Sequence, residues 1–444
     1  ITTALIADGA VGHNDLASAS VYGAKIASDA ITTDKIAANA VTTAKIADDA
    51  VGADQLASNA VVTASIADNA ITQAKLNFPV SNRNKIINGA MQISQRNGTS
   101  STNIEGNAVK YHLDRFSIQG ANLDELSAGV AQDTDSPDGF ATSMKITVNT
   151  PESAIASGEF VSVYQKMEGQ DFQDLAYGSS SPKDITMSFY VKSSITGTFS
   201  FTIYRDEPGT DRIVNKTYTI NSANTWEKKT ITIAGDTGRS VQNTTGAVWW
   251  NIWHLASGSN YDSSVSGSWQ NYTTTNWAGG HAQDGVITTN GATWAITGVQ
   301  LETGSVATDF EHRSFAQELQ LCKRYFNNFG ATTATGTSAT YMLIQGGYAR
   351  FGSANSIALQ RIFYDVEMRA TPTIKYGRNS TNDDFNVMRW SSAGTNPVVL
   401  LGSTEGSNKS GFQITRYNSD AGQTYNDGDC YTHQISKFRA DAEL

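Results

Sequence analysis

Hydrophobic positions in the first 80 residues recur every ten residues. Eight decapeptides follow one another without insertion, and each begins with Ile or Val and carries Ile or Leu at its sixth position. A spacing of five and five fits neither a helix nor a strand, so the pattern excludes a continuous coiled coil. It predicts a brief extended step and one turn per repeat. The sixth positions are Ile6, Leu16, Ile26, Ile36, Ile46, Leu56, Ile66 and Leu76.

This repeat cannot cover its own apolar face, because solenoid units that bury a core have about 20 residues or more. We therefore expect the sixth-position residues of three chains to meet on one axis, since closed symmetry suits a rod of identical chains. A disordered Ala-rich linker is the alternative, but linkers do not hold apolar register over many periods. Residues 1–80 are thus predicted to form a trimeric stalk.

After the repeats, hydrophobic residues alternate with polar ones. Ile185, Met187, Phe189 and Val191 are separated by Thr, Ser and Tyr, which predicts a strand with one buried face. Such short strands between polar turns predict a jelly-roll β-sandwich over residues 81–313. Further strand-like segments lie at Phe199–Tyr204, Lys216–Ile220, Lys229–Ile233, Val248–His254 and Thr293–Leu301.

The last part of the chain begins with helical spacing. Phe315, Leu319, Cys322 and Phe326 predict an amphipathic connecting helix over residues 314–326. The remaining runs predict a smaller C-terminal β-sandwich tip over residues 327–444, so the predicted fold class is all-β. These runs are Gly346–Phe351, Ser356–Leu359, Arg361–Glu367, Pro372–Tyr376, Val398–Leu401, Gly411–Tyr417 and Tyr431–Phe438.

Composition and charge reduce the number of possible partners. The net charge of −10, without a basic cluster, argues against a nucleic-acid partner. The longest apolar run, Val248–Ala256, is shorter than the roughly 20 residues of a membrane helix, so we expect no membrane insertion. Cys322 and Cys430 are predicted to be free thiols, with a disulfide as the alternative, and no metal or cofactor motif is present. With Ile rather than Met first, the chain is expected to continue upstream.

Several motifs together resemble bacteriophage tail-fibre and receptor-binding proteins of the short-tailed phage type; the first six occur in the same order as in that family, and the last two resemble the distal tip of tail fibres. They are NRNKIINGAMQISQRNG from Asn82, YHLDRF from Tyr111, YQKMEG from Tyr164, ITMSFYVKSSITGTFSF from Ile185, TWEKKTITIAGDTG from Thr225, GATWAITGVQLETGSVATDFEHRSFAQELQLCKRYF from Gly291, VEMRATPT from Val366 and FRADAEL from Phe438. The resemblance implies a carbohydrate-binding jelly roll and a virion tail location after synthesis in the host cytoplasm. It also implies attachment to the host surface.

Aromatic residues supply the first ligand candidates. Six of the eight Trp residues fall between Trp249 and Trp294. Trp250 and Trp294 lie in strand-like runs and are predicted to be core residues. Trp269, Tyr272 and Trp277 lie in a Gly, Ser and Asn loop, where rings are free to stack on sugar faces.

The C-terminal tip supplies a second set of candidates. Asn382, Asp383 and Asn408 carry amide or carboxylate groups of the kind that bind sugar hydroxyls, although their loops read equally as solvated turns. Because loops on a β-scaffold carry function, the tip is hypothesised to meet the cell first.

No catalytic pair of carboxylates stands out from the background, so the chain is predicted not to be an enzyme. The expected partners are further copies of itself in a homotrimer, a bacterial surface polysaccharide or outer-membrane receptor, and phage tail or adaptor proteins that attach upstream. Two alternatives remain open. Instead of binding a host receptor, the chain could be a structural fibre or spacer that docks another phage protein, or it could be a polysaccharide depolymerase.

Overall fold

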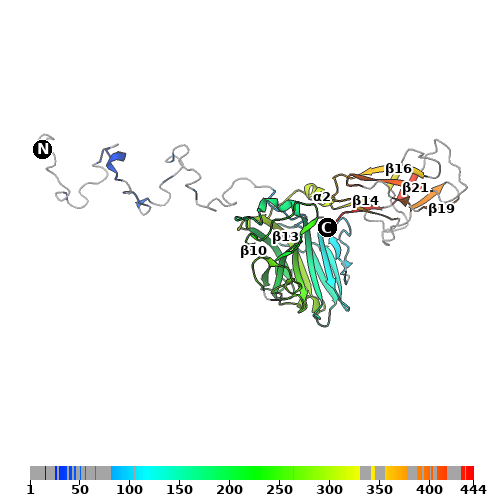
Figure 1. Ribbon diagram of the computed structural model, residues 1–444, viewed down its shortest axis with the longest axis horizontal. Helices are drawn as coiled ribbons and strands as arrows, with labels where there is room; N and C mark the ends of the chain where they lie inside the picture. The colour runs from blue at the N-terminus through cyan, green and yellow to red at the C-terminus, as the bar shows by residue number, and fades with distance from the viewer. Residues whose placement is uncertain are drawn as a thin grey trace. The chain divides into compact units, whose positions relative to one another are not determined.

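A computed structural model describes the chain in two compact units, Ile1–Pro79 and Val80–Leu444 (Figure 1). In the first unit it describes residues 16, 26–27, 30–37, 40–42, 45–46, 51, 56 and 66. In the second unit it describes residues 82–330 except 105, 108 and 264, and then 342–345, 356–377, 388–392, 395–400, 402–403, 408–417, 432–435 and 437–444.

The described part of the repeat region contains a local turn that recurs with the sequence period. A 3-10 turn, η4 (Thr33–Lys35), is closed by the Lys35 N–H, which donates to the Thr32 carbonyl at 3.0 Å. Ten residues later the Lys45 N–H donates to the Thr42 carbonyl at 2.8 Å. Each lysine thus closes a turn directly before a sixth-position residue.

The sixth-position side chains are partly exposed in the single chain. Six of them are described, and they keep between 38% and 47% of their surface exposed: Leu16, Ile26, Ile36, Ile46, Leu56 and Ile66. Ile6 and Leu76 lie outside the described residues. Regularly spaced apolar side chains at this exposure leave surface that a partner chain would cover. The trimer axis stays a prediction.

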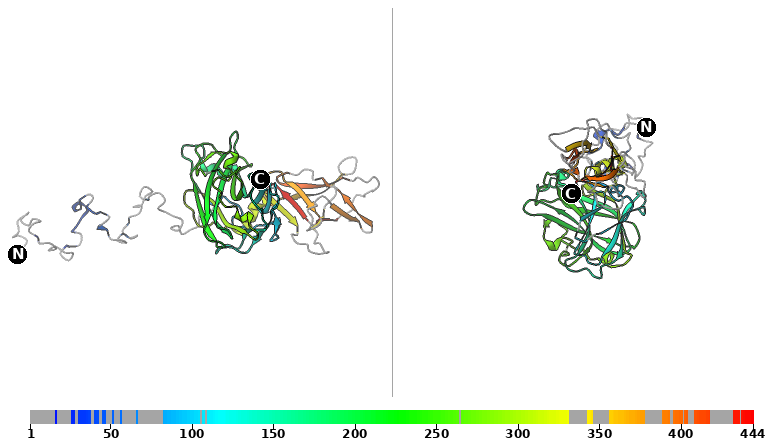
Figure 2. Two further views of the ribbon diagram at one scale, coloured as in Figure 1. Left: turned by 90° about the horizontal axis from the view of Figure 1, so that it is seen from below. Right: turned by 90° about the vertical axis from the view of Figure 1, so that its right-hand side faces the viewer.

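The second unit is dominated by two antiparallel sheets packed face to face (Figure 2). The predicted all-β fold with a jelly-roll β-sandwich is confirmed. The six-stranded sheet has the order β1 (Thr102–Asn103), β4 (Ser127–Asp133), β5 (Ser143–Thr150), β13 (Thr293–Thr303), β7 (Ile185–Ser193) and β10 (Glu227–Ile233). The seven-stranded sheet has the order β12 (Gln270–Asn271), β9 (Arg212–Ile220), β8 (Gly197–Arg205), β11 (Ala247–Ser257), β6 (Phe160–Glu168), β3 (Phe116–Ala121) and β2 (Val109–Leu113).

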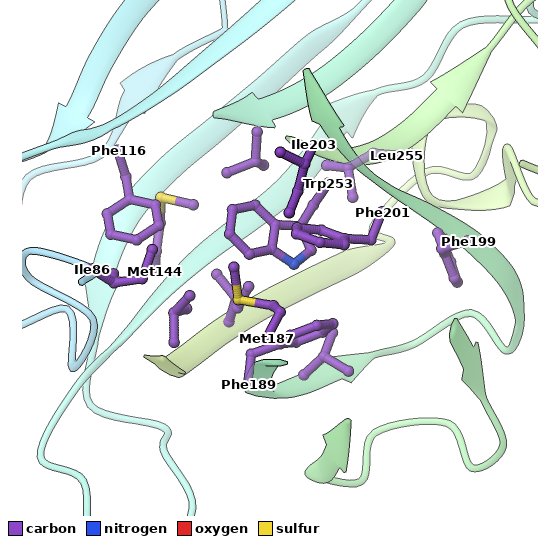
Figure 3. Packing of buried hydrophobic residues seen from close by; sticks show 14 of the residues in the cluster. Ile86, Phe116, Met144, Met187, Phe189, Phe199, Phe201, Ile203, Trp253 and Leu255 are labelled. Atoms are coloured by element: carbon purple, nitrogen blue, oxygen red, sulfur yellow. The ribbon is translucent and has the colours of Figure 1, made fainter. Parts of the chain in front are cut away.

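The main core lies between these sheets. Trp253 of β11 is fully buried and contacts aromatic rings of both sheets, with Phe201 of β8 at 5.1 Å and Phe189 of β7 at 5.9 Å between centroids (Figure 3). Met187 of β7 and Phe116 of β3 flank it. Burying large side chains of this kind contributes about 2 to 3 kcal/mol each, so the sandwich fixes the strands that carry the candidate site.

The outer face of β7 is more covered than its alternation predicts. Thr186 and Ser188 are buried, as are the core-facing residues of the strand. Phe140 packs on Tyr190 with centroids 5.5 Å apart, and the Thr186 hydroxyl donates to the Gly304 carbonyl at 2.8 Å. Chain segments before β5 and after β13 therefore cover this side of the sheet, which sequence alternation alone does not reveal.

Helix α2 (Phe315–Lys323) begins at Ser314, whose hydroxyl accepts from the Gln317 N–H at 3.3 Å. Its buried face differs from the expected one. Cys322 is buried as a free thiol, but Phe315 is 59% exposed and Glu318 is buried, where it accepts from the Asn88 N–H. The helix ends before Phe326, which is the first residue of a strand. Cys430 lies outside the described residues.

The C-terminal strands form three small antiparallel sheets. Their orders are β14 (Phe326–Gly330), β23 (Lys437–Asp441) and β17 (Thr373–Gly377); then β15 (Met342–Gln345), β22 (Thr432–Ile435), β18 (Met388–Ser392) and β19 (Thr395–Leu400); and β16 (Ser356–Phe363), β21 (Gly411–Tyr417) and β20 (Gly402–Ser403). The two strands expected around Gln360 are one continuous strand, β16. The expected strand at Gly346–Phe351 lies outside the described residues, and the finer domain boundaries within this unit stay predictions.

Buried charges join the C-terminus to the sandwich. Arg115, which follows β2, forms an ion pair with Glu443, and its guanidinium carbon lies 3.5 Å from the ring centroid of Tyr325. The Tyr111 hydroxyl donates to the Leu444 carbonyl at 2.8 Å. The FRADAEL motif at the C-terminus is therefore a structural element that pairs with the sandwich.

Candidate functional site

The candidate site lies on the outer face of the seven-stranded sheet. Because successive side chains of a strand point to opposite faces, Trp249 of β11 enters the main core and Trp250 does not. The same alternation places Phe160 and Tyr164 of β6 on the outer face, together with Tyr204 of β8. These side chains belong to a second apolar cluster that is separate from the main core.

A long loop between β11 and α1 (Gly285–Thr288) covers part of this face. It contains a 3-10 turn, η10 (Thr274–Asn276), in which the Thr273 N–H donates to the Asn276 side-chain oxygen at 2.9 Å. This turn positions Trp277 directly after it. The Thr202 hydroxyl of β8 donates to the Trp277 carbonyl at 3.1 Å, which fastens the loop to the sheet.

Sheet and loop together line an open aromatic pocket of about 270 Å³. Six of its seven lining side chains are aromatic. The rings of Trp250 and Trp277 meet at 83°, and the Tyr204 ring makes angles of 70° with Trp250 and 68° with Trp277. The rings therefore form walls at steep angles to one another and not one flat platform. The lining residues are Gln119, Phe160, Tyr204, Trp250, Tyr261, Tyr272 and Trp277.

Most polar atoms of these rings are already bonded to the protein. The Tyr204 hydroxyl donates to the Asp211 carboxylate at 2.5 Å, and the Trp250 indole N–H donates to the Ala247 carbonyl at 2.9 Å. The Tyr261 hydroxyl donates to the Gly158 carbonyl at 3.4 Å. What the pocket offers a ligand is therefore mainly apolar aromatic surface.

The surroundings of the pocket shift the pKa values of three of its side chains or neighbours. Burial, followed by the hydrogen bond to Asp211, raises the pKa of Tyr204, and burial also raises the pKa of Tyr272. The ammonium of Lys166 lies 4.0 Å from the ring centroid of Trp250, and burial lowers the pKa of this lysine. Cation and ring attract each other at this distance, which holds Trp250 in place.

Polar side chains pair beneath the loop. Ser162 Oγ lies 2.9 Å from His254 Nδ1, and His254 Nε2 lies 3.0 Å from Thr202 Oγ1. All three residues are fully buried, and burial, with the nearby His281, holds the pKa of His254 well below its usual value. A neutral imidazole with both nitrogens bonded inside the protein is a packing element, and no substrate reaches it.

The structure separates the three aromatic candidates of the loop. Tyr272 and Trp277 line the pocket, whereas Trp269 packs at the edge of the main core, where its indole N–H donates to the Ala234 carbonyl at 2.8 Å. Trp294 is fully buried in the main core, as predicted. The prediction that Trp250 belongs to the core is wrong, because its neighbour Trp249 occupies that side of β11 and Trp250 is half-buried in the pocket wall.

Sequence reasoning missed four lining residues, Gln119, Phe160, Tyr204 and Tyr261. The pair Trp249 and Trp250 was the available signal, since adjacent large aromatics on one strand must occupy both faces of a sheet. The order of strands, which brings β3, β6, β11 and β8 side by side, was not available from the sequence.

Of the three ligand candidates in the C-terminal tip, the structure describes one. Asn408 is exposed, and its side-chain oxygen accepts from the Ser410 N–H at 2.9 Å, as in a tight polar turn. Asn382 and Asp383 lie outside the described residues.

A larger hollow of about 720 Å³ lies beside α2. Charged side chains of both signs line it, including Glu311, Arg313, Arg324 and Glu367, and it contains no Trp, Tyr or Phe among its lining residues. The imidazole of His312 is the one aromatic ring among its lining residues, against six in the aromatic pocket, so the aromatic pocket remains the candidate site. Within the part of the chain that the structure describes, no group of three His, Cys, Asp or Glu side chains is placed to hold a metal ion, and no helix is long and apolar enough to span a membrane.

Comparison with known proteins gives only distant similarity. No protein-family model and no curated protein sequence matches the chain. Among solved structures, it is similar to the enzymatically active domain of tailspike protein 4 of bacteriophage CBA120, with 13% identity, a TM-score of 0.27 and coverage of 50% of this chain and 21% of that one. It is also similar to a putative sugar-binding protein from Bacteroides thetaiotaomicron, with 11% identity, a TM-score of 0.26 and coverage of 50% and 100%.

A third similar structure is a family 11 carbohydrate-binding module from Clostridium thermocellum in complex with a β-1,3-1,4-mixed-linked tetrasaccharide. The identity is 8%, the TM-score is 0.23, and the match covers 48% of this chain and 99% of the module. This chain spans about a fifth of the tailspike structure. All three TM-scores are below 0.5, so these similarities do not assign a function.

Proposed function

We propose that this chain is the distal part of a phage tail fibre whose aromatic pocket binds a glycan of the bacterial surface. One observation carries the glycan-binding proposal: a pocket of about 270 Å³ in which six of seven lining side chains are aromatic. The C–H faces of sugars pack on aromatic rings, and a few placed polar groups then fix orientation. Trp250, Tyr272 and Trp277 provide these rings from a strand and a fastened loop.

The fibre role rests on the repeat region and on the sequence motifs that resemble tail fibres. The sixth-position residues of the repeats keep about two-fifths of their surface exposed in one chain, as Ile36 does at 43%. A homotrimer covers them on a common axis. Three pockets on one rod would also strengthen attachment by about 10² to 10⁴ through avidity, so weak single sites suffice.

The proposed role is recognition without catalysis. The buried Ser162 and His254 pair is closed to substrate, and Asp211 beside the pocket accepts from Tyr204. If the chain were a depolymerase, incubation with the bound polysaccharide would release new reducing ends, and we expect none.

The test is a titration of purified full-length protein with isolated bacterial surface polysaccharides. Trp250→Ala removes a half-buried pocket wall and should weaken binding by about tenfold or more, which corresponds to about 1.4 kcal/mol. Phe315→Ala is the control, because Phe315 is an exposed aromatic residue on α2 outside the pocket. If the wild type, Trp250→Ala and Phe315→Ala bind equally well, the binding site lies outside the pocket, for example in the C-terminal tip. If the wild type binds no polysaccharide, the result favours a structural spacer.

A further inference from the structure

We infer that the pocket receives the acetamido group of a terminal N-acetylated amino sugar; this inference rests on the proposed glycan-binding function. It follows from three properties of the pocket, which are its size, its single unpaired amide and its lack of charge.

Size and shape favour one sugar residue over a chain of residues. Pockets for drug-sized ligands occupy about 300 to 1,000 Å³, and this one has about 270 Å³. An extended polysaccharide lies best on a row of coplanar rings, but Trp277 stands at 83° to Trp250 and at 78° to Tyr272. Walls at such angles surround a compact group on several sides. The end of a glycan enters such a space more readily than its middle.

The aromatic walls of the pocket offer few hydrogen-bond partners to the hydroxyl groups of a sugar. The polar atoms of Tyr204, Trp250 and Tyr261 already bond to protein groups. A sugar hydroxyl placed among them would lose water without replacing its hydrogen bonds, which costs free energy. The inserted part of the ligand must therefore carry apolar surface, such as a methyl group.

Gln119 supplies the matching polar group. It lies on the outer face of β3, lines the pocket and is half-buried. Through its backbone, Gln119 pairs with Val109 of β2 and Ser162 of β6, and among the described residues its side-chain amide has no hydrogen-bond partner. A primary amide offers both a donor and an acceptor, which an acetamido group complements through its carbonyl and its N–H. The acetamido methyl then contacts the rings.

The lining also selects against a positively charged sugar. None of the seven lining side chains carries a carboxylate that could pair with an ammonium group. The carboxylate of Asp211 near the pocket already accepts from Tyr204, and the ammonium of Lys166 lies over Trp250. A free amino sugar would therefore bring a second positive charge into aromatic surroundings without a counter-ion.

The experiment measures dissociation constants of single sugars with the full-length protein by ligand-observed NMR. The probes are the methyl glycosides of N-acetylglucosamine and N-acetylgalactosamine, their parent hexoses, and glucosamine. We expect at least one N-acetylated probe to bind about tenfold or more tightly than its parent hexose and than glucosamine. Gln119→Leu should remove most of this preference, and Gln320→Leu on α2 should retain it. Unchanged melting temperatures would show that each variant is folded.

The outcomes separate this inference from the proposed function. If all sugars bind equally and Trp250→Ala abolishes binding, the acetamido inference is overturned and the glycan site stands. The same holds if polysaccharide binding depends on Trp250 while no N-acetylated probe binds. If Gln119→Leu leaves a clear N-acetyl preference intact, the assignment to Gln119 is wrong. If polysaccharide binding is independent of Trp250, the proposed site itself fails.

Discussion

The indole of Trp250 stands at 83° to the indole of Trp277, with ring centroids 6.3 Å apart. One ring comes from a central strand of the sandwich, and the other comes from a loop that hydrogen bonds fasten above it. One wall of the pocket, Trp250, therefore belongs to the sheet, and the other, Trp277, belongs to the loop. We expect substitutions in the two walls to have different effects.

Trp277→Ala should loosen the loop as well as remove a wall. Trp277 is 8% exposed and packs against Tyr164, so its truncation should destabilise the covered region by about 3 to 5 kcal/mol. The readout is amide hydrogen exchange at Ala278, whose N–H donates to the Tyr261 carbonyl at 2.8 Å. Exchange should accelerate in Trp277→Ala and stay slow in Trp250→Ala. Equal protection in both variants would show that the ring does not hold the loop.

Glu443→Gln should destabilise the second unit. Arg115 is buried, and its guanidinium pairs with the Glu443 carboxylate and lies against Tyr325. Removing one partner of a buried ion pair costs about 3 to 5 kcal/mol, because the remaining charge has lost its counter-ion. Chemical denaturation should show this loss, and the double variant Arg115→Met with Glu443→Gln should recover part of it. A double variant no better than the single one would contradict the pairing.

The same contacts affect how the C-terminal region can be tested. A protein truncated after Phe326 would lack Asp441 and Glu443, which pair with Arg96 and Arg115 of the sandwich. Loss of adsorption after such a truncation would therefore report on stability as well as on recognition. Point substitutions in the pocket and in the tip are the sharper tools.

Asp114 should give the protein a distinct pH dependence. Burial raises the pKa of its carboxyl to about 6, although Arg96 and the hydrogen bonds from Gln95 oppose this. An unfolded aspartate titrates near pH 3.9, so between about pH 4 and 6 the folded state binds a proton that the unfolded state has released. This group therefore adds stability as the pH falls from 7 to 4, by about 2 kcal/mol. Asp114→Asn should remove that gain.

The measurement for Asp114 is the free energy of unfolding at pH 7, 5.5 and 4 for both proteins. As the pH falls, the free energy of unfolding of the wild type should increase relative to that of Asp114→Asn. A difference that stays constant over this range would mean that the carboxyl titrates normally in the folded protein.

The repeat region should hold the chains together. Light scattering of the full-length protein should give three times 47.6 kDa, because the sixth-position residues lack cover in one chain. Ile36→Asp with Ile46→Asp should loosen the stalk and increase proteolysis there, while the sandwich keeps its melting temperature. Thr32→Asp with Thr42→Asp, at polar positions of the same repeats, is the control. A monomer at micromolar concentration would end the trimer model.

Much of the fold was predictable because local patterns determine it. The alternation around Phe189 predicted β7, and the run Gly411–Tyr417 matches β21. Glu318 was not predictable as a buried residue of α2, because its partner Asn88 lies 230 residues away in sequence. Helical spacing placed Phe315 on the buried face instead, and it is exposed.

The candidate site was predictable only in part, for the same reason. Tyr272 and Trp277 stood out because they lie in a polar loop. Gln119 and Tyr204 have ordinary strand surroundings in sequence, and they join the pocket only because β3, β6, β11 and β8 are neighbours in the sheet. This part of the site therefore depends on the order of strands in the sheet, which local sequence patterns do not determine.

Fluorine NMR of the full-length protein labelled with 5-fluorotryptophan tests the central claim most directly. Each of the eight Trp resonances can be assigned by a single Trp→Phe substitution. The resonances are then followed during titration with a bacterial polysaccharide that the protein binds. We predict that the resonances of Trp250 and Trp277 shift with saturation, while that of Trp294 in the main core does not. Saturable shifts at Trp390 of β18, with Trp250 and Trp277 unchanged, would contradict the pocket and place recognition in the C-terminal region.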